Sequence, residues 1–177
     1  MSVSGPAVLR EAFRIAHQRV RDAVAGLTPD QLVWQPQPGA NSCAFLLWHI
    51  ARTADFYIHT RAQGMPEVWE RANWRQRLAV PSMPDGRSIG TGFTDQQVGA
   101  MPALPPSEYV AYLDALDLAA DRWFEGLVPE ALLQEREVAG YPRTQLLAIL
   151  LQSLGHTHAH RGEIGYVKGL MGIPGRA

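Results

Sequence analysis

Apolar residues recur at intervals of three and four positions through most of the chain, which is the spacing of one face of an α-helix. The pattern fills four long segments, 4–26, 42–64, 107–126 and 144–172. Ser4 and either Asn41 or Ser42 are suited to cap the first two segments, and a glycine stands at the end of each of the four. The sequence therefore predicts an all-α protein with four long helices.

The links between these helices differ in length, and this constrains the topology. About 15 residues join the first helix to the second, and the third to the fourth, which suits antiparallel neighbours. About 40 residues separate the second helix from the third, enough for a crossover that lets these two run parallel. We expect a single domain over 1–177, an up-down-down-up four-helix bundle with a long crossover between helices two and three. The stretch "PEVWERANWRQRL" predicts one further helix in the crossover, and the rest is expected to be Pro- and Gly-rich coil.

Composition favours a folded, soluble protein and argues against two classes of partner. Hydrophobic residues make up 46% of the chain and charged residues 19%. The net charge of −1 leaves no basic surplus to neutralise phosphates, so we expect no nucleic-acid binding. The first residues lack the pattern of a secretory signal, no apolar run is long enough to cross a membrane, and Cys43 is the only cysteine. We predict a cytoplasmic location and no membrane partner.

Half of the six histidines lie within one short stretch, as His156, His158 and His160. In a β-strand the three would share a face. The preceding "TQLLAILLQSLG" is rich in Leu and Ala, which favours a helix. Because each helical residue turns by about 100°, His156 and His160 then point inward with Ile149 and Ser153, and His158 points outward.

An inward i, i+4 histidine pair can share a metal ion, although the same spacing also occurs among core histidines. The zincin pattern is absent, because Thr157 stands where a catalytic Glu would follow the first histidine. A third candidate ligand, His49, lies at the centre of the apolar face of the second long helix. A bundle can bring His49 toward His156 and His160, and burying three unpaired histidines would be costly. Simple packing of the three in the core is the alternative.

The two histidine segments together resemble a known family. "WHIA" at 48–51 and "HTHAHRGEI" at 156–164 are similar to the W-H-[LIV]-[AG] and H-x-x-x-H-R-G-[QE]-[IL] patterns of the DinB/YfiT-like superfamily. The resemblance covers most of the chain and is weakest over 65–106. It implies an up-down-down-up four-helix bundle that holds a divalent metal ion through His49, His156 and His160.

The same resemblance implies a class of activity. The family includes transferases and isomerases that use low-molecular-weight thiols such as mycothiol, bacillithiol or glutathione, and members described only as metal-dependent hydrolases. Three histidine ligands leave an open position on a Zn, Ni or Fe ion, where a thiol or a water molecule can be activated. We expect a thiol-dependent S-transferase with a small-molecule substrate. The alternatives are a metal-dependent hydrolase and a non-catalytic metal-binding stress-response protein.

Glu163 is the candidate catalytic residue beside the histidines. It lies one turn beyond His160 on the inward side of the helix, where it would act as a general base or orient a metal ligand. A salt bridge to a neighbouring helix is the alternative. Cys43 is turned away from His49 around its helix, so we expect a small core residue rather than a nucleophile.

The outer faces of two helices carry further patterns. Asp114, Asp117 and Asp121 lie opposite an apolar stripe, which predicts a solvated acidic face, and His17 and His59 have no evident inward partner. Each glycine in a helix interior costs about 1 kcal/mol relative to alanine, and four of them share the outer face of the last helix: Gly155, Gly162, Gly165 and Gly169. Their clustering predicts close approach of another backbone, either a second copy in a homodimer or a neighbour within the chain.

Overall fold

The computed structural model describes residues 4–82 and 89–174, and most of these residues are helical. The long helical segments are α1 (Gly5–Val24), α3 (Cys43–Asp55) with its π-helical continuation η1 (Phe56–Arg61), α7 (Pro106–Glu125) and α8 (Leu146–Leu170). The shorter elements are α2 (Pro29–Val33), α4 (Val68–Arg71), α5 (Trp74–Leu78), α6 (Asp95–Gly99), the 3₁₀ turn η2 (Pro129–Leu133), β1 (Glu135–Arg136) and β2 (Thr144–Gln145). The prediction of a mainly helical protein with four long helices is confirmed.

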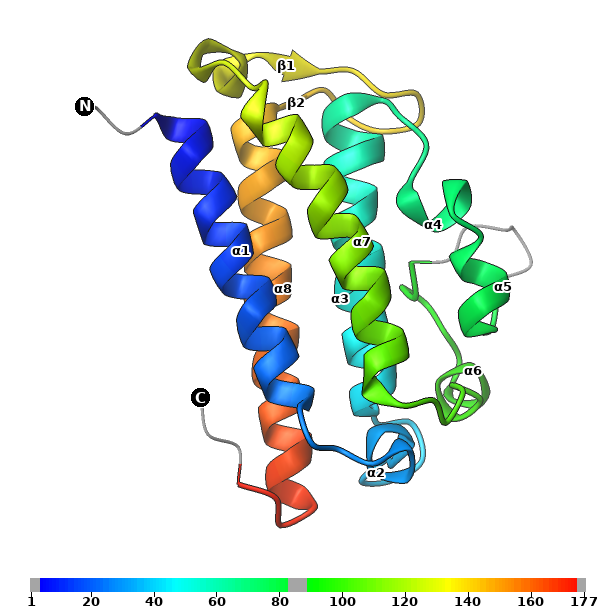
Figure 1. Cartoon of the computed structure of the whole chain (residues 1–177). Helices are drawn as coiled ribbons and strands as arrows, with labels where there is room; N and C mark the ends of the chain where they lie inside the picture. Colours follow the sequence, from blue (N-terminus) through cyan, green and yellow to red (C-terminus); the bar gives the residue numbers. More distant parts are fainter. Residues whose placement is uncertain (1–3, 83–88, 175–177) are drawn as a thin grey trace.

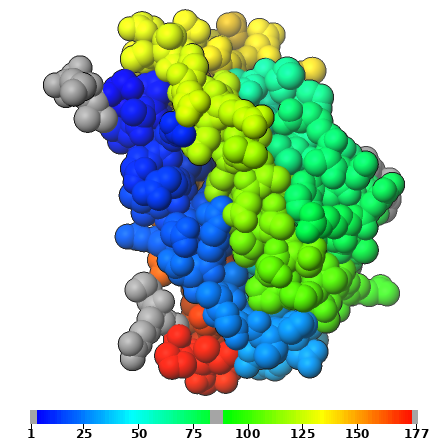
Figure 2. Space-filling view, viewed as in Figure 1, coloured from blue at the N-terminus to red at the C-terminus, as the bar shows by residue number. Residues whose placement is uncertain are grey.

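The four long helices lie side by side (Figure 1). In that view α1 and α8 run downward, whereas α3 and α7 run upward. α3 packs against both α7 and α8, and α1 packs against the same two helices. On the face shown in Figure 2, α1 and α7 are adjacent, and the segment that carries α4 and α5 covers the other flank of α7.

Local capping signals set the starts of α1, α2 and α3. The Ser4 hydroxyl caps α1, and the Ser42 hydroxyl accepts a hydrogen bond of 3.2 Å from the Phe45 amide at the start of α3. Thr28 and Gln31 form a reciprocal capping box before α2. Ser4 and Ser42 are among the residues expected to cap the first two long helices, and the starts of these helices agree with the prediction.

The crossover between η1 and α7 contains more helix than predicted. The single helix expected over 66–78 is broken into α4 and α5 at Asn73, whose φ of 53° is left-handed. α6 arises in the stretch predicted to be coil, where Thr94 and Gln97 form a second capping box. The same Thr-x-x-Gln signal that marks α2 in the sequence therefore also marks α6.

The last helix begins two residues later than predicted, because Thr144 and Gln145 form a strand. This strand, β2, pairs antiparallel with β1, with Glu135 opposite Gln145. The Leu146 amide then donates to the Gln134 carbonyl over 2.9 Å, which joins the start of α8 to the hairpin. Two-residue strands are too short to show an alternating pattern, so the sequence gives no sign of this hairpin.

α3 is the central helix of the molecule. All 13 of its residues are buried, including the polar side chains His49, Arg52, Thr53 and Asp55. A helix buried on every side must satisfy its polar groups within the protein, and α3 therefore carries the polar clusters described below. Over the described residues no helix combines the length and the apolar character needed to cross a membrane.

Candidate metal centre

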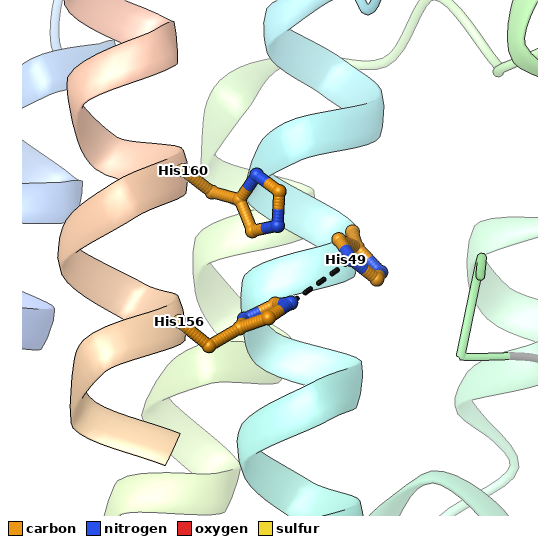
Figure 3. A group of neighbouring side chains, drawn as sticks. All are labelled: His49, His156 and His160. Atoms are coloured by element: carbon orange, nitrogen blue, oxygen red, sulfur yellow. Dashed lines mark hydrogen bonds between the residues drawn. The ribbon is translucent and has the colours of Figure 1, made fainter. Parts of the chain in front are cut away.

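Three histidines from two helices converge at the contact between α3 and α8 (Figure 3). His49 projects from the middle of α3, and His156 and His160 project toward it from successive turns of α8. One ring nitrogen from each residue lies within 4.8 Å of the other two. The Nε2 atoms of His156 and His49 are 3.0 Å apart. The structure thus brings together the three residues that the helical phase selects.

His49 is held in one orientation by the backbone. Its ring is 6% exposed, and its Nδ1 lies in hydrogen-bond contact with the Ile89 carbonyl. Because a carbonyl only accepts, Nδ1 must carry the proton, and Nε2 keeps a free lone pair that faces His156. Phe45 stacks on the imidazole, with ring centroids 5.3 Å apart and planes 11° apart. Metal-binding histidines are commonly oriented by a carbonyl at the second ring nitrogen in this way.

The approach of Ile89 to His49 depends on the glycine that follows. Gly90 has a φ of 91°, in the left-handed region. A Cβ at this position would lie 2.8 Å from the Trp48 ring, 3.0 Å from His49 Nδ1 and 3.1 Å from the Phe45 ring. Contacts this short do not persist, so any side chain at position 90 would push the segment away from His49.

Burial keeps His49 and His156 neutral. It lowers the pKa of His49 to about 4, a shift that the Ile89 carbonyl opposes and the nearby His160 reinforces. It lowers the pKa of His156 to about 3, with further lowering by His49 and His160. His156 Nδ1 is buried and has no hydrogen-bond partner among the described residues. Neutral imidazoles are the form that binds metals, so these two side chains need lose no proton at pH 7.

Glu163 lies beside the third histidine. Its Oε1 is 3.1 Å from His160 Nδ1, and its Oε2 accepts a hydrogen bond of 3.4 Å from the Asn41 amide. The pair is within ion-pair distance but lacks hydrogen-bond geometry, so a small rotation of either side chain would be needed for the carboxylate to orient the ring of His160. Glu163 makes no ion pair with a neighbouring helix among the described residues, so the alternative of an interhelical salt bridge is not observed.

The spacing of the three nitrogens fits a metal ion. Nitrogen ligands lie about 2.0–2.1 Å from zinc, so two ligands of a tetrahedral ion are about 3.3 Å apart. The 3.0 Å between His49 and His156 is close to that value, and the 4.8 Å limit for the whole set requires only small side-chain shifts. Without an ion, His156 Nε2 can donate a hydrogen bond to His49 Nε2, the contact drawn as a dashed line in Figure 3, and a cation between the two nitrogens would replace it.

Two neighbouring residues lie where the helical phase places them. His158 is exposed on the outer side of α8 and does not belong to the histidine group. Cys43 is fully buried, and burial raises the pKa of its thiol to about 11, against a lowering by Lys168. Cys43 thus lies in the core, as the helical phase predicts, and burial disfavours its thiolate form.

The predicted acidic face on α7 is solvated at Asp114 and in part at Asp121, but all three carboxylates pair with basic residues of α1, which was not predicted. Asp117 lies 2.5 Å from both His17 Nδ1 and the Arg21 guanidinium, and Asp114 and Asp121 also pair with arginines of α1. Burial would raise the pKa of Asp117, but His17 and Arg21 together hold it below its usual value. The phase of α7 alone could not reveal this seam, because the basic partners lie on α1, about 100 residues earlier in the chain.

His59 also has a partner, within a second buried polar group that we call the Asp55 cluster: Arg52, Asp55, His59, Glu67 and Tyr112. Asp55 is fully buried. It accepts hydrogen bonds from the amides of Val68 (3.0 Å) and Trp69 (2.8 Å) and from the Tyr112 hydroxyl (2.6 Å), and it lies 2.7 Å from His59 Nδ1. Arg52 bonds Glu67 over 2.6 Å. This cluster joins α3 and η1 to α4 and α7.

The histidine site includes one segment that the sequence did not indicate. Ile89 and Gly90 contact His49, and the Phe93 ring packs on Phe45 and Trp48 at centroid distances of 5.9 and 5.4 Å. These residues lie in the irregular part of the crossover, where no periodic pattern assigns a side chain to a face. The glycines at 90 and 92 are the only local sign of an unusual backbone there.

A comparison with protein families finds a match, and the matched region includes all three histidines. The DinB superfamily matches the chain over residues 12–164, which includes α3 and most of α8. The chain therefore belongs to the DinB superfamily. A search of curated proteins gives no match.

Solved structures similar to this one are known from three bacteria. A conserved protein from Enterococcus faecalis superposes with a TM-score of 0.80 at 19% identity, covering 96% of this chain and 98% of that one. A DinB-like protein from Bacillus cereus gives 0.63 at 13% identity, with 96% and 94% covered. YfiT from Bacillus subtilis, described as a probable metal-dependent hydrolase with an unusual four-helix bundle topology, gives 0.63 at 16% identity, with 97% and 91% covered. At these identities the similarity establishes the fold alone.

Proposed function

We propose that this protein is a metal-dependent enzyme, built on an up-down-down-up four-helix bundle, in which His49, His156 and His160 hold one divalent ion such as Zn, Ni or Fe. The observation that carries the proposal is the convergence of three ring nitrogens within 4.8 Å, two of them on imidazoles kept neutral by burial. The Ile89 carbonyl and Glu163 lie at the outer nitrogens of His49 and His160. Sites of this kind, with three protein ligands and a free position, are typical of catalytic metals.

The chemistry of the ligand set suggests what the site activates. Three neutral ligands leave the full charge of a divalent ion, which would lower the pKa of a thiol or a water molecule in the free position. The residues of this chain then have separate tasks. Phe45 shields one face of His49, and Glu163 orients His160.

We propose a low-molecular-weight thiol as the co-substrate, and S-transfer to a small molecule as the reaction, in a cytoplasmic setting. The support is the state of the chain's own thiol: Cys43 is buried, protonated and 4.0 Å from the Ile164 carbonyl. A sulfur nucleophile would therefore have to come from outside the chain. Thiol-dependent transfer is also one of the activities that the family resemblance implies.

Hydrolysis is the second candidate, with a water molecule in place of the thiol. The specific observation in its favour is the structural neighbour YfiT, which is described as a probable metal-dependent hydrolase. Glu163 is the carboxylate closest to the histidines that could accept a proton from water in that reaction.

Cobalt substitution separates the two candidates. The protein, purified without a histidine tag, is loaded with Co(II) and titrated with mycothiol, bacillithiol and glutathione. We expect a sulfur-to-cobalt charge-transfer band with at least one thiol, and its loss in His160→Ala. No band with any thiol, together with hydrolysis of test esters or amides, would favour the hydrolase. Failure to bind any divalent ion would overturn both.

We also propose that a second copy of the chain packs on the outer face of α8. A Cβ on any of its four glycines would meet no heavy atom within 4 Å, so no neighbour among the described residues explains them. The exposed residues of α8 include no Asp, Glu, Lys or Arg, and among them are Leu151, Tyr166 and Leu170. A face without these charges can pack against a copy of itself, as an isologous dimer requires. Light scattering should give a dimer that Gly162→Arg converts to a monomer with unchanged metal content, and a wild-type monomer at micromolar concentration would overturn the proposal.

A further inference from the structure

A cavity lies at the end of the bundle that carries the hairpin of β1 and β2, away from the histidines. Figure 1 shows this end of the bundle. The cavity has a volume of about 550 Å³, and it lies between the end of η1, the end of α7 and the strand β1. Arg61, Trp123 and Arg136 are among its lining residues. Arg61 follows His49 by 12 positions in one continuous helical run, which is about 18 Å along the axis. The cavity is therefore separate from the proposed metal site.

Arg61 is a buried cation without an acidic partner. Its residue is only 8% exposed, and it forms no ion pair with any Asp or Glu in the described segments. One terminal nitrogen makes two long contacts with neutral acceptors, the Pro142 carbonyl at 3.3 Å and the Thr144 hydroxyl at 3.4 Å. The guanidinium also lies 4.7 Å from the centre of the Tyr141 ring. The Nε atom is buried and has no hydrogen-bond partner.

Arg136 brings a second unpaired guanidinium to the same cavity. It lies on β1 opposite Thr144, the residue that Arg61 contacts. Its Nε is also buried without a hydrogen-bond partner. Arg136 forms no ion pair and no side-chain hydrogen bond with any other residue in the described part of the chain. A guanidinium presents its donors in a fixed fork that matches the two oxygens of a carboxylate or phosphate. Two guanidinium groups with unused donors line one cavity, so an anion bound there could accept hydrogen bonds from both.

The other charged groups at the cavity offset the positive charge of Arg61 and Arg136 only in part. Glu137 is the one acidic lining residue, but its carboxylate is highly exposed and lies 3.7 Å from Arg143 Nε. The ends of η1 and α7 present carbonyl oxygens to this region, and these attract cations weakly. They help to explain why Arg61 tolerates burial, but they leave both Nε donors unbonded.

We propose that this cavity binds a small organic carboxylate with an apolar body. The two arginines would bind the carboxylate through the guanidinium N–H groups that line the cavity. The apolar body would contact the remaining lining side chains, which are largely uncharged: Ala62, Met65, Trp123 and Val138. Inorganic phosphate has the oxyanion but no apolar body, so it would bind more weakly.

The test uses the full-length, metal-loaded protein and three probes. Phenylacetate carries both features, phenylacetamide is its uncharged counterpart, and sodium phosphate is the oxyanion alone. We expect calorimetric or NMR titration to detect phenylacetate binding at least about tenfold tighter than that of the amide, because the charge-assisted contacts are absent from the amide. Phosphate should fall between the two. Equal binding of phenylacetate and phenylacetamide, or no binding of phenylacetate at millimolar concentration, would overturn the proposal.

Variants assign the binding to the arginines. Arg136→Gln should weaken phenylacetate binding about tenfold or more, and Arg61→Lys should do the same because lysine keeps the charge but lacks the planar fork. The matched control is Arg14→Gln, since Arg14 is exposed, pairs with Glu11 of α1 over 2.6 Å and is not among the lining residues of the cavity. Equal losses in the Arg136 and Arg14 variants would indicate a general charge effect and contradict the assignment. Metal content should be unchanged in all three, which separates this result from the fate of the histidine site.

Discussion

The Asp55 cluster and the histidine triad are both buried polar groups on the α3–η1 segment, but their polar atoms have different partners. Asp55 receives three hydrogen bonds from backbone amides and a hydroxyl, and it lies 2.7 Å from His59. In the triad, the partners lie at the outer nitrogens of His49 and His160. The inner nitrogens face one another, as the 3.0 Å between His49 and His156 shows.

The difference separates a structural cluster from a ligand site. Buried polar groups that stabilise a fold have their hydrogen-bonding capacity met within the protein. Asp55 meets this condition through the Val68 and Trp69 amides and the Tyr112 hydroxyl, so the Asp55 cluster connects α3 and η1 to α4 and α7. In the triad the backbone orients His49 from outside, and the inner nitrogens have only one another as partners, which is the arrangement expected where an ion can take their place. The predictions below test whether the two clusters differ in this way.

The largest effect on stability is expected for Asp55→Ala. The change leaves the Val68 and Trp69 amides and the Tyr112 hydroxyl without their acceptor, and breaking a buried pair of this kind costs about 3–5 kcal/mol. Urea unfolding should show this loss. The control Asp114→Ala removes a half-exposed carboxylate that pairs with Arg21 and should cost under about 1 kcal/mol. Similar losses of unfolding free energy in the two variants would contradict the structural role of the Asp55 cluster.

His156→Ala should have a large effect on metal binding and a small effect on the stability of the metal-free protein. Loss of one of three ligands should weaken metal binding by more than about 100-fold, above the range for outer-shell changes. The unfolding free energy of the metal-free protein should change far less than in Asp55→Ala, because the ring that is removed has an unpartnered Nδ1 and a single hydrogen-bond contact, with His49. Elemental analysis and unfolding in chelator measure the two effects. The exposed His158→Ala should change neither, and equal metal loss from both variants would contradict the ligand assignment.

Gly90→Ala should weaken metal binding without removing a ligand. The added Cβ displaces the Ile89 carbonyl from His49, and loss of such an orienting contact costs about tenfold in metal affinity. Gly26→Ala is the control, since Gly26 has a similar φ of 77° but open space around it. It should lose about 1–2 kcal/mol of stability from backbone strain alone. If both variants bind metal as the wild type does, Ile89 has no orienting role.

A smaller effect is expected in the acid stability of the protein. Burial would raise the pKa of Asp55, but His59, Tyr112 and the Trp69 amide together hold it below its ordinary 3.8, with Arg52 also 3.8 Å away. A carboxyl with a lowered folded pKa contributes stability that is complete above its unfolded pKa and lost as the pH falls through the folded pKa. The difference in unfolding free energy between wild type and Asp55→Asn should therefore be constant above about pH 5 and shrink below 3.8. A difference that does not change with pH would show that Asp55 is not ionised in the folded protein.

Much of the histidine site could be predicted from the sequence because α-helices have a fixed period. The phase of 100° per residue is enough to separate His156 and His160 from His158. The same reasoning identifies His49 on the inner face of another helix. Cap residues such as Ser4 and Ser42 have their effect within one turn, so helix starts were also predictable.

The same reasoning failed where the decisive partner was distant in the chain. Asp117 looks solvated from the phase of α7, and only its contact with His17 and Arg21 of α1 makes it part of a buried seam. His59 looked unpartnered until α3, η1, α4 and α7 came together around Asp55. Helical phase tells which way a side chain points, but it does not tell which side chain it meets.

By itself, the sequence determined the helices, their inward faces and the three histidines, because these follow from local periodicity and capping. Only the tertiary structure decided that His49 Nδ1 meets the Ile89 carbonyl, that Gly90 allows this approach, and that Arg61 and Arg136 share a cavity. These contacts join an irregular segment or a two-residue strand to a helix. Such segments have no period from which a contact can be read, so their place is fixed by packing of the whole chain.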